Sequence, residues 1–131
     1  MNVQMNGPRE HCPLTFAVKV ISGKWKLFIL HSLVDGTKRY GEIRKISDNL
    51  TEKMLTSQLR ELEKDGIIHR KVYAQVPPKV EYSLTELGEK LCFLFDPLYK
   101  WGIEYVKKMK PDQVKLLTEG EQAYISTNLT E

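Results

Sequence analysis

The chain has 131 residues, of which 41% are hydrophobic and 28% are charged, and its net charge is +3. These values predict one soluble globular domain whose core needs neither a disulfide nor a metal, and they exclude a disordered chain. No apolar run approaches the roughly 18–20 residues that span a bilayer. The first residues, MNVQMNGPREH, also lack the apolar region of a secretory signal. We therefore expect a cytoplasmic protein with no membrane partner.

Charge is distributed unevenly along the chain. Residues 24–80 contain 12 Lys and Arg against 7 Asp and Glu, a net charge of +5. Residues 81–131 contain 6 against 9, a net charge of −3. This asymmetry is expected if the middle of the chain binds an anion, although many neutral domains show it too.

The residues that could carry catalysis or bind a metal form no recognisable motif. The histidines, His11, His31 and His69, are scattered, and no CxxC or HExxH pattern occurs. No nucleophile–base set, paired carboxylate motif or glycine-rich phosphate loop is present. We therefore predict no enzyme, no catalytic residue, no metal and no cofactor. Cys12 and Cys92 are expected to be free thiols, because structural disulfides are rare in the cytosol.

Two helices are predicted in the first third of the chain. Apolar residues recur at helical spacing from Pro13 to Ser22, and Gly23 ends this segment. The next helix, within residues 24–36, is apolar over much of its circumference. We therefore place it at the centre of the core.

A short helix and a longer amphipathic helix follow. The short one runs from Tyr40 to about Ile46, and residues 47–50 form a turn. Thr51 is a suitable N-cap for the longer helix, although Met54 cannot complete a capping box. That helix is expected to end at Asp65–Gly66.

The remaining segments are a hairpin and a final helix. The runs IIHRKVY and VEYSL are typical of strands, and the loop AQVPPK between them predicts a β-hairpin with a semi-rigid tip. A long helix begins at Thr85 and should be kinked or interrupted at Pro97. The order of elements predicts a mainly helical α+β fold, a winged helix-turn-helix with a long C-terminal helix. Such a fold places one helix in the DNA major groove and the hairpin beside it.

The amphipathic helix carries the strongest candidate for a binding surface. Leu55, Leu59 and Leu62 point toward the core. The opposite side carries a polar stripe at i, i+3, i+4 and i+7 spacing, formed by Lys53, Thr56, Ser57 and Arg60. Such a stripe is more often plain solvated surface, but here the glutamates of the helix lie off it. Arg can pair with guanine, hydroxyls fit bases or phosphates, and Lys neutralises phosphate. We therefore predict that the stripe binds double-stranded DNA.

Further cations lie where a winged helix meets the DNA backbone. Lys38 and Arg39 precede the short helix, and the hairpin carries Arg70, Lys71 and Lys79. Each alone is more often plain surface, and together they predict backbone and wing contacts. Tyr40 is expected either to donate to phosphate or to close the core, with equal support for both.

The segments CPLTFAVKVISGKWKLFILHSLVDGTKRYGEIRKI and LTEKMLTSQLRELEKDGIIHRKVYAQVPPKVEYSLTELGEKL resemble the HxlR family of bacterial winged helix-turn-helix regulators, within the MarR-like superfamily. The resemblance covers about residues 12–106. Its marks are Cys12-Pro13, GKWK at 23–26, the runs at 53–66 and 76–88, and Trp101-Gly102. It implies a transcriptional regulator, by default a repressor, that binds a palindromic operator as a homodimer.

The resemblance also suggests roles for both ends of the domain. It implies that the first and last helices form the dimer contact. The apolar stripe Leu94, Leu98, Trp101 and Tyr105 agrees with this, although burial within one subunit explains it equally well. We expect an N-terminal arm at residues 1–11, the DNA-binding domain with its dimerisation helices at 12–110, and a tail without assigned role at 111–131.

Family members often sense electrophiles or oxidants through a cysteine directly before the first helix, the position of Cys12 here. A thiol near a helix N-terminus has more thiolate and is more easily oxidised. Cys92 is better explained as a small buried hydrophobe than as its disulfide partner. The alternative is a regulator without a cysteine switch, whose aromatic residues Phe93, Phe95, Tyr99 and Trp101 line a pocket for a small effector at the dimer interface.

Overall fold

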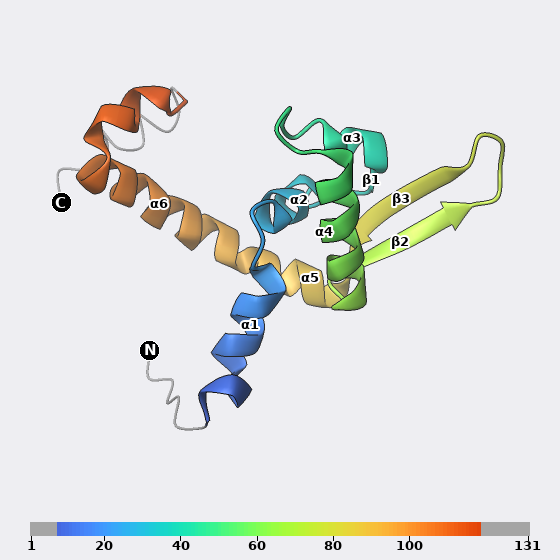
Figure 1. The fold of residues 1–131 in the computed structure, drawn as a ribbon, viewed down its shortest axis with the longest axis horizontal. Coiled ribbons are helices and arrows are strands. Elements are labelled where there is room, and N and C mark those ends of the chain that lie inside the picture. Colours follow the sequence, from blue (N-terminus) through green and yellow to red (C-terminus); the bar gives the residue numbers. More distant parts are fainter. Residues whose placement is uncertain (1–7, 119–131) are drawn as a thin grey trace. The chain divides into compact units, whose positions relative to one another are not determined.

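The computed structural model describes residues 8–118, which belong to two compact units divided after Cys92. The first unit contains α1 (Pro13–Ile21), α2 (Lys26–Ser32), β1 (Lys38–Arg39), α3 (Tyr40–Arg44), α4 (Glu52–Lys64), β2 (Ile68–Tyr73), β3 (Lys79–Leu84) and α5 (Glu86–Leu91) (Figure 1). A 3₁₀ turn, Arg9–His11, precedes α1. The second unit contains α6 (Phe95–Met109) and a 3₁₀ segment, Pro111–Leu116, that packs on it. The first unit is a winged helix-turn-helix, as predicted.

The core of the first unit is built around α2. Ile29 and Leu30 of this helix are completely buried, as are Ile43 of α3 and Leu55 and Leu62 of α4. Because the buried residues of α4 recur at helical spacing, its other side is left for solvent. This confirms both the central place of the second helix and the predicted inner side of the amphipathic one.

Local hydrogen bonds set the two ends of α4. The Thr51 hydroxyl accepts a hydrogen bond from the Met54 backbone N–H at 3.1 Å, which makes Thr51 the N-cap. The chain leaves the helix through Gly66, whose φ of +76° favours a residue without a Cβ. Both predicted ends are confirmed.

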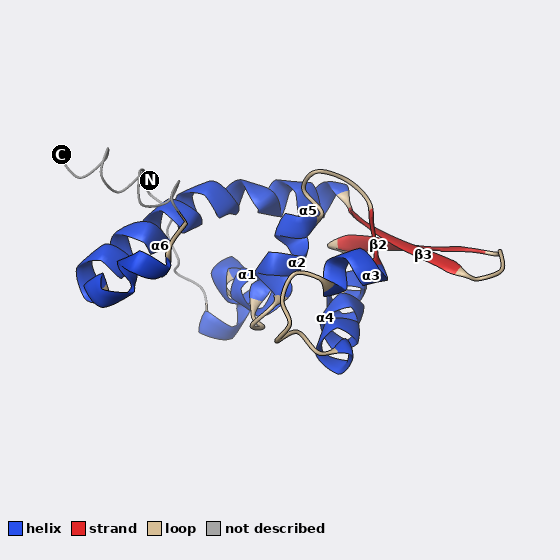
Figure 2. Ribbon diagram, turned by 90° about the horizontal axis from the view of Figure 1, so that it is seen from above, coloured by secondary structure: helices blue, strands red, loops and turns tan. Residues whose placement is uncertain are grey.

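The sheet has three antiparallel strands in the order β1-β3-β2, and β2 and β3 form the predicted hairpin (Figure 2). Strand β1 was not predicted. It pairs Lys38 with Tyr82 and Arg39 with Glu81. A strand of two residues has no periodicity, so only its pairing with β3 reveals it.

The predicted interruption of the C-terminal helix is confirmed, but it lies before Pro97 rather than at it. The helix ends at Leu91, a 3₁₀ segment spans Cys92–Leu94, and α6 starts at Phe95. Pro97 therefore lies in the first turn of α6 rather than in a helix interior. In a continuous helix the ring of Pro97 would clash with the backbone carbonyl of Phe93, four residues earlier, and the helix is therefore interrupted around Phe93. No helix within residues 8–118 is long and apolar enough to cross a membrane.

Candidate nucleic-acid interface

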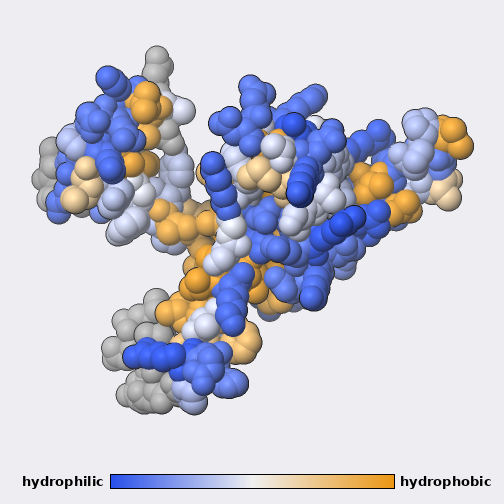
Figure 3. All heavy atoms as spheres, in the orientation of Figure 1, coloured by the Kyte–Doolittle hydropathy of each residue, from blue (hydrophilic) through white to orange (hydrophobic). Residues whose placement is uncertain are grey.

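The polar stripe of α4 lies on the surface, and three of its four side chains have no partner among residues 8–118. Lys53, Ser57 and Arg60 are exposed, and none makes a side-chain hydrogen bond or ion pair with residues 8–118. The molecular surface over α3 and α4 is largely hydrophilic (Figure 3). An ammonium, a hydroxyl and a guanidinium are thus available together on one side of a helix.

The fourth member of the stripe is held differently. Thr56 is half-buried, and its hydroxyl lies 3.3 Å from the hydroxyl of Tyr40, at the start of α3. The Tyr40 hydroxyl also lies 3.2 Å from the backbone carbonyl of Glu52, to which it donates. Tyr40 therefore joins the two helices of the helix-turn-helix.

The segment before α3 is stabilised by acidic residues. The backbone N–H of Arg39 donates to Glu42 Oε1 at 3.0 Å, which caps α3. The Lys38 ammonium lies 3.2 Å from Asp35 Oδ1. The hydrogen bond and charge of Lys38 lower the pKa of Asp35 from its ordinary value of 3.8. Lys38 is therefore engaged by a carboxylate, whereas the Arg39 side chain is exposed.

The strand register divides the predicted backbone and wing cations between two faces of the sheet. Residues directly opposite each other share a face, and successive residues alternate. One face carries Arg39, Lys71, Tyr73, Lys79 and Glu81. The other face carries Lys38, Arg70 and the buried Tyr82. The structure thus gathers three of the five cations and separates the other two from them.

Glu81 and Tyr73 organise the cationic face of the wing. Lys79 Nζ lies 2.8 Å from Glu81 Oε1, and the ammonium groups of Lys71 and Lys79 lie 4.8 and 4.7 Å from the centroid of the Tyr73 ring. The hydrogen bond from Lys79 lowers the pKa of Glu81 from 4.5, although desolvation opposes this shift. Glu81 therefore stays charged and offsets part of the positive charge of the wing.

Sequence reasoning missed one cation beside the stripe. A cavity of about 250 Å³ lies between the start of α2 and the first turns of α4. The missed cation, Lys24, lines it together with two members of the stripe, Lys53 and Ser57. The other lining residues are Trp25, Met54 and Gln58. Lys24 Nζ lies 5.4 Å from the centroid of the Trp25 ring. The motif GKWK could have revealed this cation. Its two lysines are two residues apart and therefore point in different directions, and because Lys26 is buried, Lys24 is the one on the surface.

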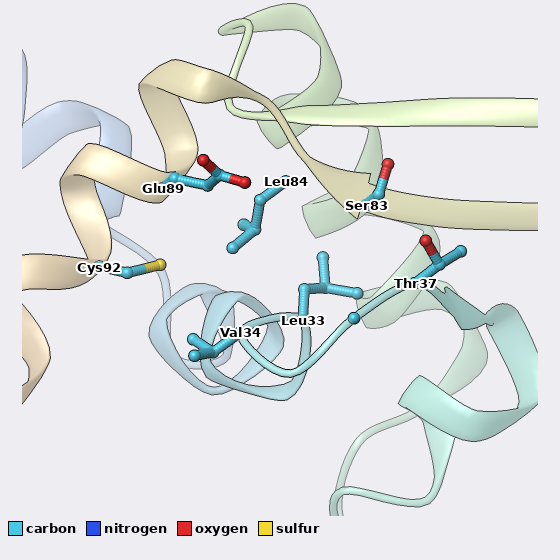
Figure 4. Close-up of a pocket in the computed structure, with 8 residues that line it drawn as sticks. Leu33, Val34, Thr37, Ser83, Leu84, Glu89 and Cys92 are labelled. Carbon is cyan, nitrogen blue, oxygen red and sulfur yellow. The ribbon is translucent and has the colours of Figure 1, made fainter.

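A second cavity, of about 330 Å³, lies where the chain leaves α2, at the end of β3 and along α5 (Figure 4). Its lining residues are Leu33, Val34, Gly36, Thr37, Ser83, Leu84, Glu89 and Cys92. Desolvation and, after it, the charge of Glu89 raise the pKa of the Cys92 thiol. This cavity contains none of the aromatic residues predicted to form an effector pocket.

Cys12 occupies the N-cap position of α1 and is only 7% exposed. Both Cys12 and Cys92 are free thiols. No group of three or more His, Cys, Asp or Glu that could hold a metal occurs in the described part of the chain.

Several large apolar side chains are exposed on α1 and along the segment that leads into α6. In α1, Leu14, Phe16 and Val18 are at least half exposed, and the helix has no buried residue. The four residues of the predicted dimer stripe, Leu94, Leu98, Trp101 and Tyr105, are also exposed, with Trp101 at 61%. The rings of Trp101 and Tyr105 stack at 5.4 Å between centroids.

The sequence matches the family model described as HxlR-like helix-turn-helix over residues 20–110, well over half of the chain. The chain belongs to the HxlR family. It is also 53% identical over 94 residues to YybR, an HTH-type transcriptional regulator of Bacillus subtilis (strain 168), covering 72% of this chain and 75% of that protein. The HxlR-family chain is therefore a helix-turn-helix transcriptional regulator and not an enzyme.

Solved structures of other regulators are similar to this chain in fold and sequence. The redox regulator HypR matches in its reduced form with a TM-score of 0.71 and 48% identity, covering 76% of this chain and 98% of that one. Its oxidised form matches with a TM-score of 0.65 and 54% identity, covering 70% and 94%. A regulator assigned to the MarR family, from Porphyromonas gingivalis W83, matches with a TM-score of 0.70 and 39% identity, covering 76% and 97%.

Proposed function

We propose that this HxlR-family regulator is a homodimeric repressor that binds a palindromic DNA operator in the bacterial cytoplasm. The observation that carries the proposal is the set of unpartnered polar groups, Lys53, Ser57 and Arg60, on the exposed side of a capped helix. Arg60 is suited to a base edge, and Lys53 to phosphate. Arg39, Lys71 and Lys79 on one face of the sheet supply further positive charge for the DNA backbone.

The exposed apolar side chains of α1 and α6 support a homodimer. A monomer rarely exposes several large apolar residues on one helix, and α6 exposes Leu98, Trp101 and Tyr105 at helical spacing. Two-fold pairing of such surfaces would place two copies of α4, the candidate recognition helix, on one DNA duplex, which is why a palindromic operator is expected.

The experiment is selection of duplexes from a randomised pool, followed by binding titrations at several salt concentrations. We expect selected sites with two inverted half-sites and binding by a dimer in analytical ultracentrifugation. Leu98→Glu, placed on the exposed stripe, should yield monomers with weakened operator binding, whereas Glu104→Gln on the same helix should not. A selected site without symmetry, bound by a monomer, would contradict the proposal. A reporter gene behind the selected site then distinguishes repression from activation.

We further propose that Cys12 makes DNA binding sensitive to oxidants or electrophiles. Cys12 lies at the N-cap of α1, and HypR, to which this chain is similar, is a redox regulator. Because Cys12 is buried, reaction requires the N-terminus of α1 to open locally.

The redox test uses diamide or a quinone on operator-bound protein. Release that is lost in Cys12→Ser and kept in Cys92→Ser supports Cys12 as the sensor. If Cys12→Ser still releases DNA, the cysteine switch is wrong.

A second candidate is control by a small molecule without a cysteine switch, and the cavity of about 330 Å³ beside α5 favours it. This volume is at the lower end of the range for small-molecule sites. Ligand control predicts that a bound compound shifts operator affinity equally in wild type and Cys12→Ser, which separates the two candidates.

A further inference from the structure

The described part of the chain buries one charged side chain, that of Lys26, which is 4% exposed. Lys26 is the first residue of α2, and its Nζ lies 2.6 Å from Glu61 Oε2 in α4. The Glu61 side chain is 52% exposed. The pair therefore joins the centre of the core to the surface of the candidate recognition helix.

Burying the Lys26 ammonium is costly in free energy, because this charge loses its hydration while its partner, Glu61, stays half exposed. An apolar side chain of similar shape is often equally stable at such a position, or more so. The burial of Lys26 therefore calls for an explanation other than folding.

The position of Glu61 supplies that explanation. Successive residues of an α-helix are rotated by about 100°, so Glu61 lies one turn after Ser57 and on nearly the same side. It is also the immediate neighbour of Arg60. An unpaired carboxylate there would repel the phosphates of DNA that approach the stripe. Pairing with Lys26 neutralises this carboxylate from the core side.

The backbone near Lys26 is fixed against the same flank of α4. Gly23 has a φ of +141°, and a Cβ added there would overlap the Gln58 amide oxygen. Gln58 and Glu61 are three residues apart and therefore lie on one side of the helix. Gly23 therefore lies close to Gln58, on the flank of α4 that also carries Glu61.

From these contacts we infer that Lys26 is a positioning residue for DNA recognition. Its buried ammonium neutralises Glu61, so that no unpaired carboxylate repels DNA beside the stripe of α4. The inference rests on the proposed function, because it concerns the same recognition helix, but it adds a residue that itself touches no DNA.

The test compares four proteins: wild type, Lys26→Met, Glu61→Gln and the double variant. Methionine keeps the linear, buried shape of lysine without its charge. Lys90→Met is the matched control, because it removes the same charge from an exposed ion pair with Glu86 in α5. The probe is a duplex selected by the wild-type protein, and each variant is also melted to check its fold.

We expect Lys26→Met to melt no lower than wild type and to raise the Kd for the selected duplex about tenfold, since it leaves an unpaired carboxylate beside Arg60. Adding Glu61→Gln should return the Kd to within about threefold of wild type, and Lys90→Met should change it by less than about twofold. A purely structural role would not be rescued by removing Glu61.

Unchanged binding by folded Lys26→Met, or weak binding that Glu61→Gln does not rescue, overturns the inference. If Lys26→Met does not fold, the test rests on the double variant, Lys26→Met with Glu61→Gln. A double variant that binds the duplex with wild-type affinity supports the inference, and one that binds weakly or does not fold overturns it. If wild type selects no duplex, the proposed function fails as well, so the two failures are distinguishable.

Discussion

The hydroxyl of Tyr40 lies 3.3 Å from that of Thr56 and 3.2 Å from the Glu52 carbonyl oxygen, so one side chain of α3 ties down the first two turns of α4. Tyr40→Phe removes these bonds and keeps the ring. We expect the free energy of unfolding to fall by about 1 kcal/mol. The affinity for DNA at fixed salt should change little, because the Tyr40 hydroxyl is bound within the protein. Chemical denaturation and binding titrations measure the two effects, and a loss of affinity by a folded variant would assign the hydroxyl to phosphate instead.

Arg60 and Lys53 should differ in how they affect DNA binding. Arg60→Ala is expected to weaken binding to the selected duplex by about 1–3 kcal/mol and to relax preference at one base position. Lys53→Met should instead weaken binding to all sequences and reduce the salt slope by roughly 0.9. Titrations on selected and scrambled duplexes separate these patterns. Equal losses on both duplexes for Arg60→Ala would show that it only contacts phosphate.

Glu81 should restrain non-specific DNA binding by the wing. Glu81→Gln removes the carboxylate that pairs with Lys79 and shares a sheet face with Arg39 and Lys71. We expect tighter binding to scrambled DNA with a steeper salt dependence, because three cations lose their internal counter-charge. Glu86→Gln in α5 removes an equal charge away from the wing and should have no such effect. Weaker binding by Glu81→Gln would mean that Glu81 orders the wing for DNA.

The same carboxylate has a defined acid titration. Because Lys79 lowers the pKa of Glu81 in the folded protein, the ion pair stabilises the fold above the ordinary pKa of 4.5 and is lost as the pH falls through the lowered value. Carboxyl chemical shifts should give a midpoint below 4.5 in wild type. In Lys79→Met the midpoint should rise toward the ordinary value, and a midpoint unaffected by Lys79→Met would refute the assigned cause.

Two glycines should respond oppositely to alanine. Gly23→Ala places a Cβ against the Gln58 amide oxygen in a backbone conformation that favours glycine, so we expect it to destabilise the fold by about 1–3 kcal/mol. Gly41→Ala lies in α3 with open space around the new methyl group and should stabilise by up to about 1 kcal/mol through helix propensity. Thermal melts of both variants test this, and similar effects would contradict it.

Cys92 should react slowly with alkylating agents. Desolvation and Glu89 raise the pKa of its thiol, so little thiolate is present at neutral pH. In a Cys12→Ser background, we expect iodoacetamide to modify Cys92 more slowly than a free cysteine peptide, and urea to abolish the difference. Mass spectrometry provides the rates, and a rate at or above that of the peptide would make Cys92 a candidate sensor.

Local sequence determined most of the elements of this protein. The buried positions of α4, the cap at Thr51 and the glycine after the helix follow from short-range periodicity and hydrogen bonding, which a sequence displays directly. The hairpin followed from its β-rich runs and proline loop. The stripe of α4 was also readable, because side chains three and four residues apart share a helix side.

Only the tertiary structure decided which of those side chains remain available. Thr56 and Lys38 are engaged by Tyr40 and Asp35, and the pairing of β1 with β3 assigns the wing cations to opposite faces. The burial of Lys26 against Glu61 was equally hidden, since the two residues are 35 positions apart in sequence. Contacts between distant segments depend on how the elements pack, and no local pattern records that packing.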